Sequence, residues 1–402
     1  MSKPKVVLAF SGGLDTSFCV KYLAEDKGYE IYSVLVDTGG FSEEDLKTIE
    51  ANAYELGVKQ HTTIIKTEAY YDDCIKYLIF GNVLKNNTYP LSVSAERIFQ
   101  AVAVAEYAKE IGANAIAHGS TGAGNDQVRF DMAFRIIIPE AEIITPIRDL
   151  KLSREAEIDY LTKKGVVREW TKAAYSINKG LWGTSVGGKE TLTSDQYLPE
   201  EAWPTQVTKT TPETITIEFE NGELTGLNGV KYDSSVQVIQ EIAAIAQPFG
   251  IGRDIHVGDT IIGIKGRVGF EAAAPLIIIK AHHTLEKHVL SEQQLYWKEQ
   301  LANNYGTLLH KGQFVEPVMR NIETFLADTQ KHVSGKVHVH LAPYRFHIEG
   351  IESPFDLMSS IFGSYGEMNN AWTGDDVRGF SKVASNQVMI YQKVSDAVAA
   401  QK

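Results

Sequence analysis

Through the first 165 residues, short apolar runs alternate with segments whose apolar residues recur every three or four positions. The runs predict strands at 6–10, 29–36, 62–66, 113–117 and 143–145. The recurring pattern predicts helices at 16–26, 43–56, 69–84, 96–111 and 153–164, with Ser42 and Ser153 as caps. Strands that alternate with helices in this way indicate right-handed crossovers. We therefore expect a doubly wound parallel sheet of the Rossmann-like α/β class.

The pattern changes from about residue 170. Loop-like sequence covers 191–209, strands are expected at 214–220, 259–265 and 276–280, and helices at 236–246 and 285–305. This region predicts a second domain of the α+β class. After about residue 352 the chain is rich in Gly, Ser and Asn, with a last strand expected near 388–394. We predict domains at 1–168 and 169–355 and a tail, 356–402, that packs on a neighbouring subunit as an oligomerisation arm.

Composition adds constraints on partners and location. A length of 402 residues suits two domains, and the net charge of −12 argues against nucleic-acid binding. The two cysteines are too few for a disulfide framework and lack zinc spacing. We expect a cytoplasmic protein, because no apolar run reaches membrane length and the chain enters a strand without a signal peptide.

The segment Ser11–Ser17 carries the first candidate chemistry. Two glycines, Gly12 and Gly13, follow a strand and precede a helix that Asp15, Thr16 and Ser17 can cap. Such a turn predicts an anion cradle at a helix N-terminus, with Mg²⁺ beside Asp15. The alternative is a glycine-rich turn before an ordinary helix. The Walker-like match at 183–190 ends in Glu, so we interpret it as chance.

A second loop, 118–130, follows the strand at 113–117. It combines three glycines with Thr121, Asn125, Asp126 and Arg129, whose guanidinium suits a substrate carboxylate. Both loops should line the crevice beyond the carboxyl ends of the strands. The alternative is a polar loop in which Asn125 or Asp126 caps the next helix.

Three motifs carry a resemblance to a known family. They are Thr-Gly-x-Gly-Asn-Asp-Gln-x-Arg-Phe at 121–130, Tyr-Ser-Ile-Asn-Lys-Gly-Leu-Trp-Gly-Thr-Ser at 175–185, and the weaker match 251–267. On these residues the chain resembles the argininosuccinate synthases, members of the ATP pyrophosphatase superfamily. The resemblance spans about residues 5–350. It implies that Mg-ATP activates citrulline as an adenylate and that aspartate then displaces AMP, with no permanent cofactor and in a homotetramer.

The resemblance also implies roles for single residues. Catalytic roles would fall to Asp15, Asp126 and Arg129. ATP would contact Ala9, Phe10, Ser11, Gly12, Gly13, Leu14, Asp15, Thr16, Ser17, Val36 and Gly119. Aspartate would contact Thr121, Asn125 and Asp126, and citrulline would contact Tyr89, Ser94, Asn125, Arg129, Ser176, Ser185, Gly258 and Phe270. Arg97 could equally make a surface ion pair.

The chain departs from the family pattern at two citrulline positions. Gly258 and Phe270 stand where the family usually presents a Glu and a Tyr, and 92–98 also differs from the usual Gly-Thr-Ser-Leu-Ala-Arg-Pro. A buried ammonium without its carboxylate is costly, so Asp254 or Asp259 replaces the Glu or the ligand lacks that ammonium. The alternatives are therefore an N-acylated citrulline, another adenylated acceptor, or a nucleotide sensor. The histidine groups at 282–288 and 338–340 lack metal-site spacing, and no bound metal is expected apart from Mg²⁺ with ATP.

Overall fold

The computed structural model describes residues 3–168, 170, 175–358, 362–363, 365–368 and 371–401. The chain forms two compact units, Met1–Phe355 and Asp356–Lys402. The domain boundary predicted between residues 168 and 169 lies next to residues that the structure does not describe, so this boundary stays a prediction.

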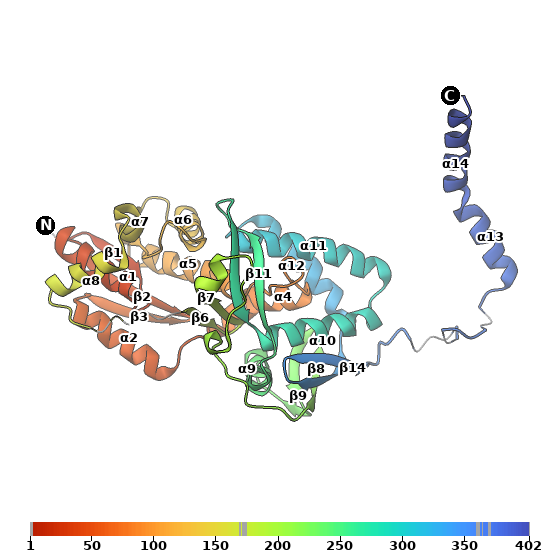
Figure 1. Cartoon of the computed structure of the whole chain (residues 1–402), viewed down its shortest axis with the longest axis horizontal. Coiled ribbons are helices and arrows are strands. Elements are labelled where there is room, and N and C mark those ends of the chain that lie inside the picture. The colour runs from red at the N-terminus through yellow and green to blue at the C-terminus, as the bar shows by residue number, and fades with distance from the viewer. Residues whose placement is uncertain are drawn as a thin grey trace. The chain divides into compact units, whose positions relative to one another are not determined.

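A five-stranded parallel sheet forms the N-terminal part of the first unit, in the order β3-β2-β1-β4-β5 (Figure 1). Its strands are β1 (Lys5–Ala9), β2 (Glu30–Asp37), β3 (Gln60–Ile65), β4 (Ala115–Ala117) and β5 (Glu142–Ile144). The predicted doubly wound sheet is confirmed. The strand order reverses between β1 and β4, which places the ligand crevice of such a sheet at that point.

Helices cover both faces of this sheet. One face carries α1 (Leu14–Lys21), α2 (Glu43–Leu56), α7 (Pro146–Leu150) and α8 (Arg154–Lys163). The other carries α5 (Ser92–Glu110) and α6 (Asp126–Ile137), whereas α3 (Thr67–Tyr70) and α4 (Lys76–Phe80) belong to the core shared with the antiparallel part. A π-helical turn at Tyr22–Asp26 extends α1, and a second one at Tyr71–Ile75 joins α3 to α4. Because both faces are buried at the centre of the sheet, β1 after Lys5 and β4 are apolar along their length, as the sequence indicated.

The rest of the first unit is antiparallel, which confirms the predicted α+β class. A four-stranded sheet, β11-β12-β7-β6, contains β6 (Ser176–Gly180), β7 (Gly183–Gly187), β11 (Arg253–Asp259) and β12 (Lys265–Glu271). A five-stranded sheet, β10-β9-β8-β13-β14, contains β8 (Glu213–Glu220), β9 (Glu223–Leu227), β10 (Val230–Lys231), β13 (Gly335–Ala342) and β14 (Arg345–Glu352). The helices here are α9 (Ser235–Ala246), α10 (Ala273–Val289), α11 (Glu292–His310) and α12 (Pro317–Thr329).

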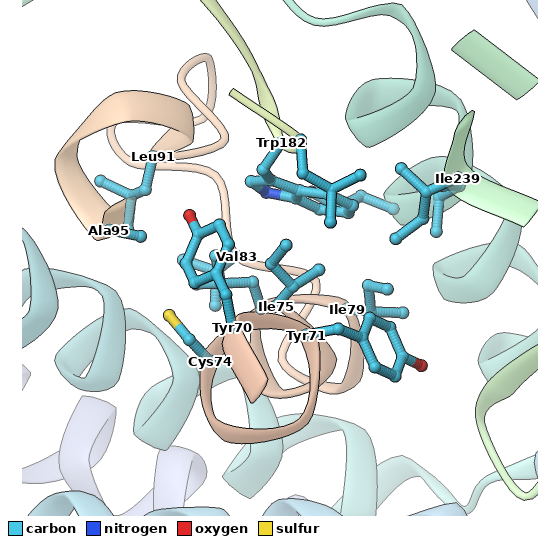
Figure 2. Close-up of a cluster of buried hydrophobic side chains, with 14 of the residues drawn as sticks. Tyr70, Tyr71, Cys74, Ile75, Ile79, Val83, Leu91, Ala95, Trp182 and Ile239 are labelled. Atoms are coloured by element: carbon cyan, nitrogen blue, oxygen red, sulfur yellow. The ribbon is translucent and has the colours of Figure 1, made fainter. Parts of the chain in front are cut away.

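One apolar core joins the parallel sheet to the antiparallel part. Figure 2 shows its centre, where Tyr70, Ile75 and Ile79 lie near Val83 and Trp182. Trp182 is fully buried, and its indole N–H donates to the Pro90 carbonyl at 3.0 Å. This packing fixes the β6–β7 turn against the segment that enters α5. The parallel sheet and the antiparallel part, which both contribute to the site described below, therefore share one core.

Three expected strands are wrong. The run 276–280 lies in α10, where Ile277, Ile278 and Ile279 are all buried, so no alternation distinguishes helix from strand. Residues 260–264 form the turn of the β11–β12 hairpin, closed by bonds between Thr260 and Ile264. The stretch 388–394 lies in a helix, α14 (Asn386–Ala399). The expected helix 285–305 is two helices, because α10 ends at Val289 and Ser291 caps α11.

The second unit contains α13 (Gly374–Ala384) and α14, and no described residue of either helix is buried. In α13, Val377, Phe380 and Val383 recur at helical spacing and are 47%, 75% and 69% exposed. Among the described residues of this unit, none buries this apolar stripe.

Candidate functional site

A cavity of about 360 Å³ opens beyond the carboxyl ends of β1, β2 and β4, at the point where the strand order reverses. We call it the nucleotide cavity. Its lining includes nine of the predicted ATP contacts: Ala9, Phe10, Ser11, Gly13, Leu14, Asp15, Thr16, Val36 and Gly119. Gly12 and Ser17 belong to the same turn but do not line the cavity. The structure thus brings the predicted nucleotide residues together.

The turn from β1 into α1 presents backbone N–H groups to this cavity. Gly12 takes φ +76°, a left-handed conformation that favours glycine. The expectation that Asp15, Thr16 and Ser17 cap the helix is wrong, because the N-cap is Gly13 and has no side-chain cap bond. The first N–H groups of a helix have no partner within it, and here no side chain replaces one. This geometry is that of an anion cradle.

Two carboxyl groups lie together beside the cradle. Burial and the neighbouring Asp15 carboxylate raise the pKa of Glu157, on α8, well above its usual range. The Glu157 Oε2 atom is buried and has no hydrogen-bond partner. Asp15 lines the cavity itself. The pair can hold a proton or face a cation that arrives with a phosphate ligand.

A second cavity, of about 220 Å³, lies between the 118–126 loop, the start of α5 and the β11–β12 hairpin. We call it the inner cavity. Seven predicted substrate residues line it: Tyr89, Ser94, Asn125, Asp126, Arg129, Ser185 and Gly258. Among the lining residues of the two cavities, Asp126 alone is common to both.

Asp126 starts α6 and accepts a hydrogen bond from Arg129 Nη1 at 2.8 Å. Arg129 is buried and also donates through Nε and Nη2 to the His310 carbonyl, at 3.2 and 2.9 Å. The alternative in which Asn125 caps α6 with its side chain is not what the structure has, because Asn125 Oδ1 instead accepts from the Ile261 N–H at 2.8 Å. Asn125 thereby ties the hairpin turn to the loop.

Three of the predicted substrate residues lie outside both linings. Thr121 and Ser176 are exposed, on the loop and on β6. Phe270 is fully buried behind Tyr89, with 5.3 Å between ring centroids. Their assigned roles stay predictions. The segment 183–190 is strand β7 followed by a short turn, which supports the interpretation of its Walker-like match as chance.

A buried polar network under the nucleotide cavity was missed by sequence reasoning. Arg97 is no surface residue: it donates to Gln100 Oε1 and to Asn178 Oδ1, each at 2.8 Å, and lines the cavity. Gln100 Nε2 donates to Glu96 Oε1 at 2.9 Å and to the Val36 carbonyl at 3.3 Å. The network joins the end of β2 to the wall opposite the cradle.

Glu96 is the unusual member of this network. A Cβ on Gly180 would lie 1.8 Å from its Oε2 atom, so any side chain at 180 would displace the Glu96 carboxyl group. Burial raises the pKa of Glu96 to about 7, against the opposing charge of Arg97. The sequence feature that could have indicated this network is Glu96 itself, because it is a charged residue on the apolar side of the predicted helix 96–111.

The raised pKa of Glu96 predicts a pH-dependent stability. A carboxyl group that binds its proton more tightly when folded stabilises the protein at low pH, and this contribution is lost as pH rises from 4.5 towards 7. Relative to Glu96→Gln, the wild type should lose up to about 3 kcal/mol of unfolding free energy between pH 5 and 8. Urea denaturation at both pH values measures this.

Glu110→Gln, on the exposed end of α5, is the matched control and should show no such difference. An equal pH dependence in the wild type and Glu96→Gln would show that Glu96 is ionised throughout.

The described residues contain no group of three or more His, Cys, Asp or Glu side chains able to hold a metal ion. The histidines of the two groups bond to protein side chains: His282 is buried and bonded to Asn82 and Gln330, and His338 pairs with Thr216 and Glu352. Among the described helices, none combines the length and apolar character needed to cross a membrane.

Comparison with known proteins covers nearly the whole chain. Residues 5–167 match the family model described as arginosuccinate synthase N-terminal HUP domain, and residues 175–391 match the arginosuccinate synthase C-terminal domain. The chain is 39% identical over 389 residues to the argininosuccinate synthase of Methanocaldococcus jannaschii, which covers 96% of this chain and 97% of that protein. It is 36% identical to that of Dictyoglomus thermophilum (97% and 98% covered) and 34% to that of Xanthomonas campestris (98% and 100%).

Proposed function

Since this chain belongs to the argininosuccinate synthase family, an ATP-using ligase of arginine biosynthesis, we propose that its two cavities hold the two halves of that reaction. ATP occupies the nucleotide cavity, and the ureido substrate occupies the inner cavity. The observation that carries this assignment is that the two linings share Asp126. Reacting groups bound in the two cavities therefore meet beside its carboxylate.

In the first half-reaction the ureido oxygen attacks the α-phosphorus of ATP. A new P–O bond forms, the bond to the bridging oxygen breaks, and its electron pair leaves with pyrophosphate. The free N–H groups of the turn after β1 bind the pyrophosphate oxygens, and Ser11 and Thr16 hydroxyls line the same wall. Arg97 stands across the cavity, where a guanidinium can stabilise charge at the phosphorus. Catalysis here is positioning and charge stabilisation.

In the second half-reaction the amine of aspartate attacks the activated ureido carbon. The C–N bond forms as the C–O bond to AMP breaks, and the amine releases its protons. Asp126 is 40% exposed in its side chain and reaches both cavities, so we assign it to hold the aspartate amine. Asn125, Arg129 and Ser185 remain the proposed contacts for the other substrate groups.

Magnesium is proposed to arrive with ATP. Asp15 lines the cradle, and the buried Glu157 oxygen beside it has no partner, so the donors present fit a cation held mainly by phosphate oxygens. Bound there, the ion neutralises charge on the leaving pyrophosphate.

The test of this function is product release from Mg-ATP. AMP and pyrophosphate should form in equal amounts only when aspartate and a ureido amino acid are both present at steady state. Release of ADP, or release that does not depend on aspartate, would contradict it.

We propose that the second unit joins four copies into a homotetramer. Its helices expose apolar side chains that include Val377, Phe380, Val383, Ile390, Tyr391 and Val394. Such residues cannot stay in water without cost, so we infer that they pack on another copy of this chain.

Phe380→Ser should shift the full-length protein from tetramer towards smaller species, because it removes the largest side chain of the α13 stripe. Lys382→Ser, on the same helix, should leave the mass unchanged. Light scattering coupled to gel filtration measures both. A tetramer that survives Phe380→Ser with unchanged dissociation would contradict the role of α13.

A further inference from the structure

Arg97 reaches the nucleotide cavity from a clamp of polar side chains. Its Nη1 atom donates to Gln100 Oε1 and its Nη2 atom donates to Asn178 Oδ1, each at 2.8 Å. Its Nε atom lies 3.5 Å from Asp126 Oδ2. Each nitrogen of the guanidinium thus faces an oxygen on the protein, and Arg97 itself lines the cavity. A cation held in this way is already oriented when charge develops on a bound phosphate, which is the condition for effective electrostatic stabilisation.

Gln100 is the member of the clamp whose amide is used in two directions. Its oxygen accepts from Arg97, and its nitrogen donates to Glu96 Oε1 at 2.9 Å. The same nitrogen faces the Val36 carbonyl and the Thr38 hydroxyl, each at 3.3 Å. An amide turned the other way would set its N–H groups against the guanidinium, where two donors would meet. The orientation of this buried amide therefore decides whether Arg97 is held.

Glu96 accepts the shortest of the bonds that the amide nitrogen donates. It is buried and does not line the nucleotide cavity. Its Oε1 atom also lies 3.6 Å from Arg97 Nη1, whereas no described residue forms a hydrogen bond with its Oε2 atom. A carboxyl group with one oxygen buried and unpaired is unfavourable, and burial raises its pKa to about 7. The contact that this group provides is therefore the one to the Gln100 amide.

The carboxyl group at 96 departs from the family pattern. In the sequence Gly-Thr-Ser-Leu-Ala-Arg-Pro that is usual at 92–98, the arginine stands at 97 and an alanine at 96. Alanine has no side-chain acceptor, so that pattern cannot orient an amide from position 96. This chain thus keeps the arginine of the pattern and adds a carboxyl group behind it.

We propose that Glu96 and Gln100 are positioning residues of the adenylation step: Glu96 fixes the orientation of the Gln100 amide, and the amide holds the Arg97 guanidinium towards the α-phosphate. The inference rests on the proposed function, because it is there that Arg97 stabilises charge at the phosphorus. Neither residue forms or breaks a bond in the reaction. Glu96 acts only through its neighbours, since it lies outside the cavity lining.

The test measures exchange of labelled pyrophosphate into ATP by the full-length protein, with the ureido substrate and without aspartate. Glu96→Met keeps the length of the side chain and removes the acceptor, so it should lower kcat for exchange by about tenfold, the loss of one buried contact. KM for ATP should change by less than about threefold, because the turn after β1 is untouched. Glu96→Gln keeps an oxygen that can accept the bond, and its kcat should stay within about threefold of the wild type.

Stability separates positioning from a structural role. Glu96→Met replaces a buried ionisable group with an apolar side chain of similar size, a change that is often neutral or stabilising. Its urea midpoint at pH 8 should therefore equal or exceed that of the wild type while kcat falls. Glu110→Met, at the exposed end of α5, is the matched control and should change neither quantity.

A double variant tests whether Glu96 acts through Gln100. Gln100→Met should by itself lower kcat for exchange by about tenfold. If the amide transmits the effect, adding Glu96→Met should cause no further loss, because the acceptor then has no amide to orient. Independent action would instead multiply the two losses to about a hundredfold.

The outcomes separate this inference from the proposed function. An unchanged kcat in Glu96→Met, multiplied losses in the double variant, or a kcat of Glu96→Gln as low as that of Glu96→Met would each overturn the positioning role. A lowered urea midpoint in Glu96→Met would show that Glu96 supports the fold instead. If the wild type forms no AMP and pyrophosphate from Mg-ATP, aspartate and citrulline, the proposed function itself fails.

Discussion

Replacing Gly12 by valine is expected to abolish pyrophosphate release, lowering kcat by more than about a thousandfold. Gly12 takes φ +76°, and a Cβ there would lie 3.3 Å from Ile49 Cγ1. A valine side chain would force the turn away from α2 and move the N–H groups that we assign to pyrophosphate. Removing a single positioned donor from such a site costs about 10²–10³ in kcat, and this change displaces several donors.

A matched control separates the loss of the cradle from backbone strain. Gly28 has almost the same φ, +75°, and a Cβ there meets nothing within 4 Å. Gly28→Val therefore carries the strain without reaching the nucleotide cavity, and it should retain activity. Release of AMP and pyrophosphate by both variants, with circular dichroism to verify folding, makes the comparison. Substantial turnover by Gly12→Val would contradict the placement of pyrophosphate in this turn.

Asp126→Ala is expected to reduce formation of the aspartate adduct by about a hundredfold or more while changing adenylate formation by less than about tenfold. Asp126 reaches both cavities and pairs with Arg97 at 3.5 Å, but the adenylation step keeps its donors in the cradle and in Arg97, which Gln100 and Asn178 also hold. The lost carboxylate contributes a charge-assisted contact to the aspartate amine and also pairs with Arg129 at 2.8 Å.

Exchange of labelled pyrophosphate into ATP, with the ureido substrate and without aspartate, reports the first half-reaction. Formation of the final product reports the second. Asp126→Asn keeps the shape of the side chain and removes its charge, so it should show the same imbalance in smaller degree. Equal loss of both half-reactions in Asp126→Ala would refute the assigned role.

The fold was most predictable where local signals and packing agree. Helix α2 lies at Glu43–Leu56, as expected, because Ser42 caps it and the apolar face recurs at helical spacing. The doubly wound sheet followed from apolar strands alternating with helices. The run 276–280 misled because the consecutive apolar residues 276–279 conceal the helical period of α10, whose Lys280, His283 and Lys287 are exposed. The run 388–394 misled because its apolar residues lie on a helix that is exposed within its own unit.

The candidate site was predictable only along continuous segments. The turn after β1 and the loop after β4 each carry several functional residue types in one short stretch, and the structure sets both at the edge where the strand order reverses. His256 and His310 line the inner cavity but come from distant parts of the chain, and they meet there only through tertiary packing. The burial of Glu96 could not be predicted for another reason. Glu96 lies on α5 and is covered by Gly180 of β6, which is distant in the sequence.

The most direct test of the account follows one oxygen atom. The ureido substrate, labelled with ¹⁸O in its ureido group, is converted with aspartate and Mg-ATP, and the AMP is analysed by mass spectrometry. The account predicts one labelled oxygen in the phosphate of each AMP, because the ureido oxygen attacks the α-phosphorus and leaves with it. Unlabelled AMP would contradict an adenylate formed where the two cavities meet.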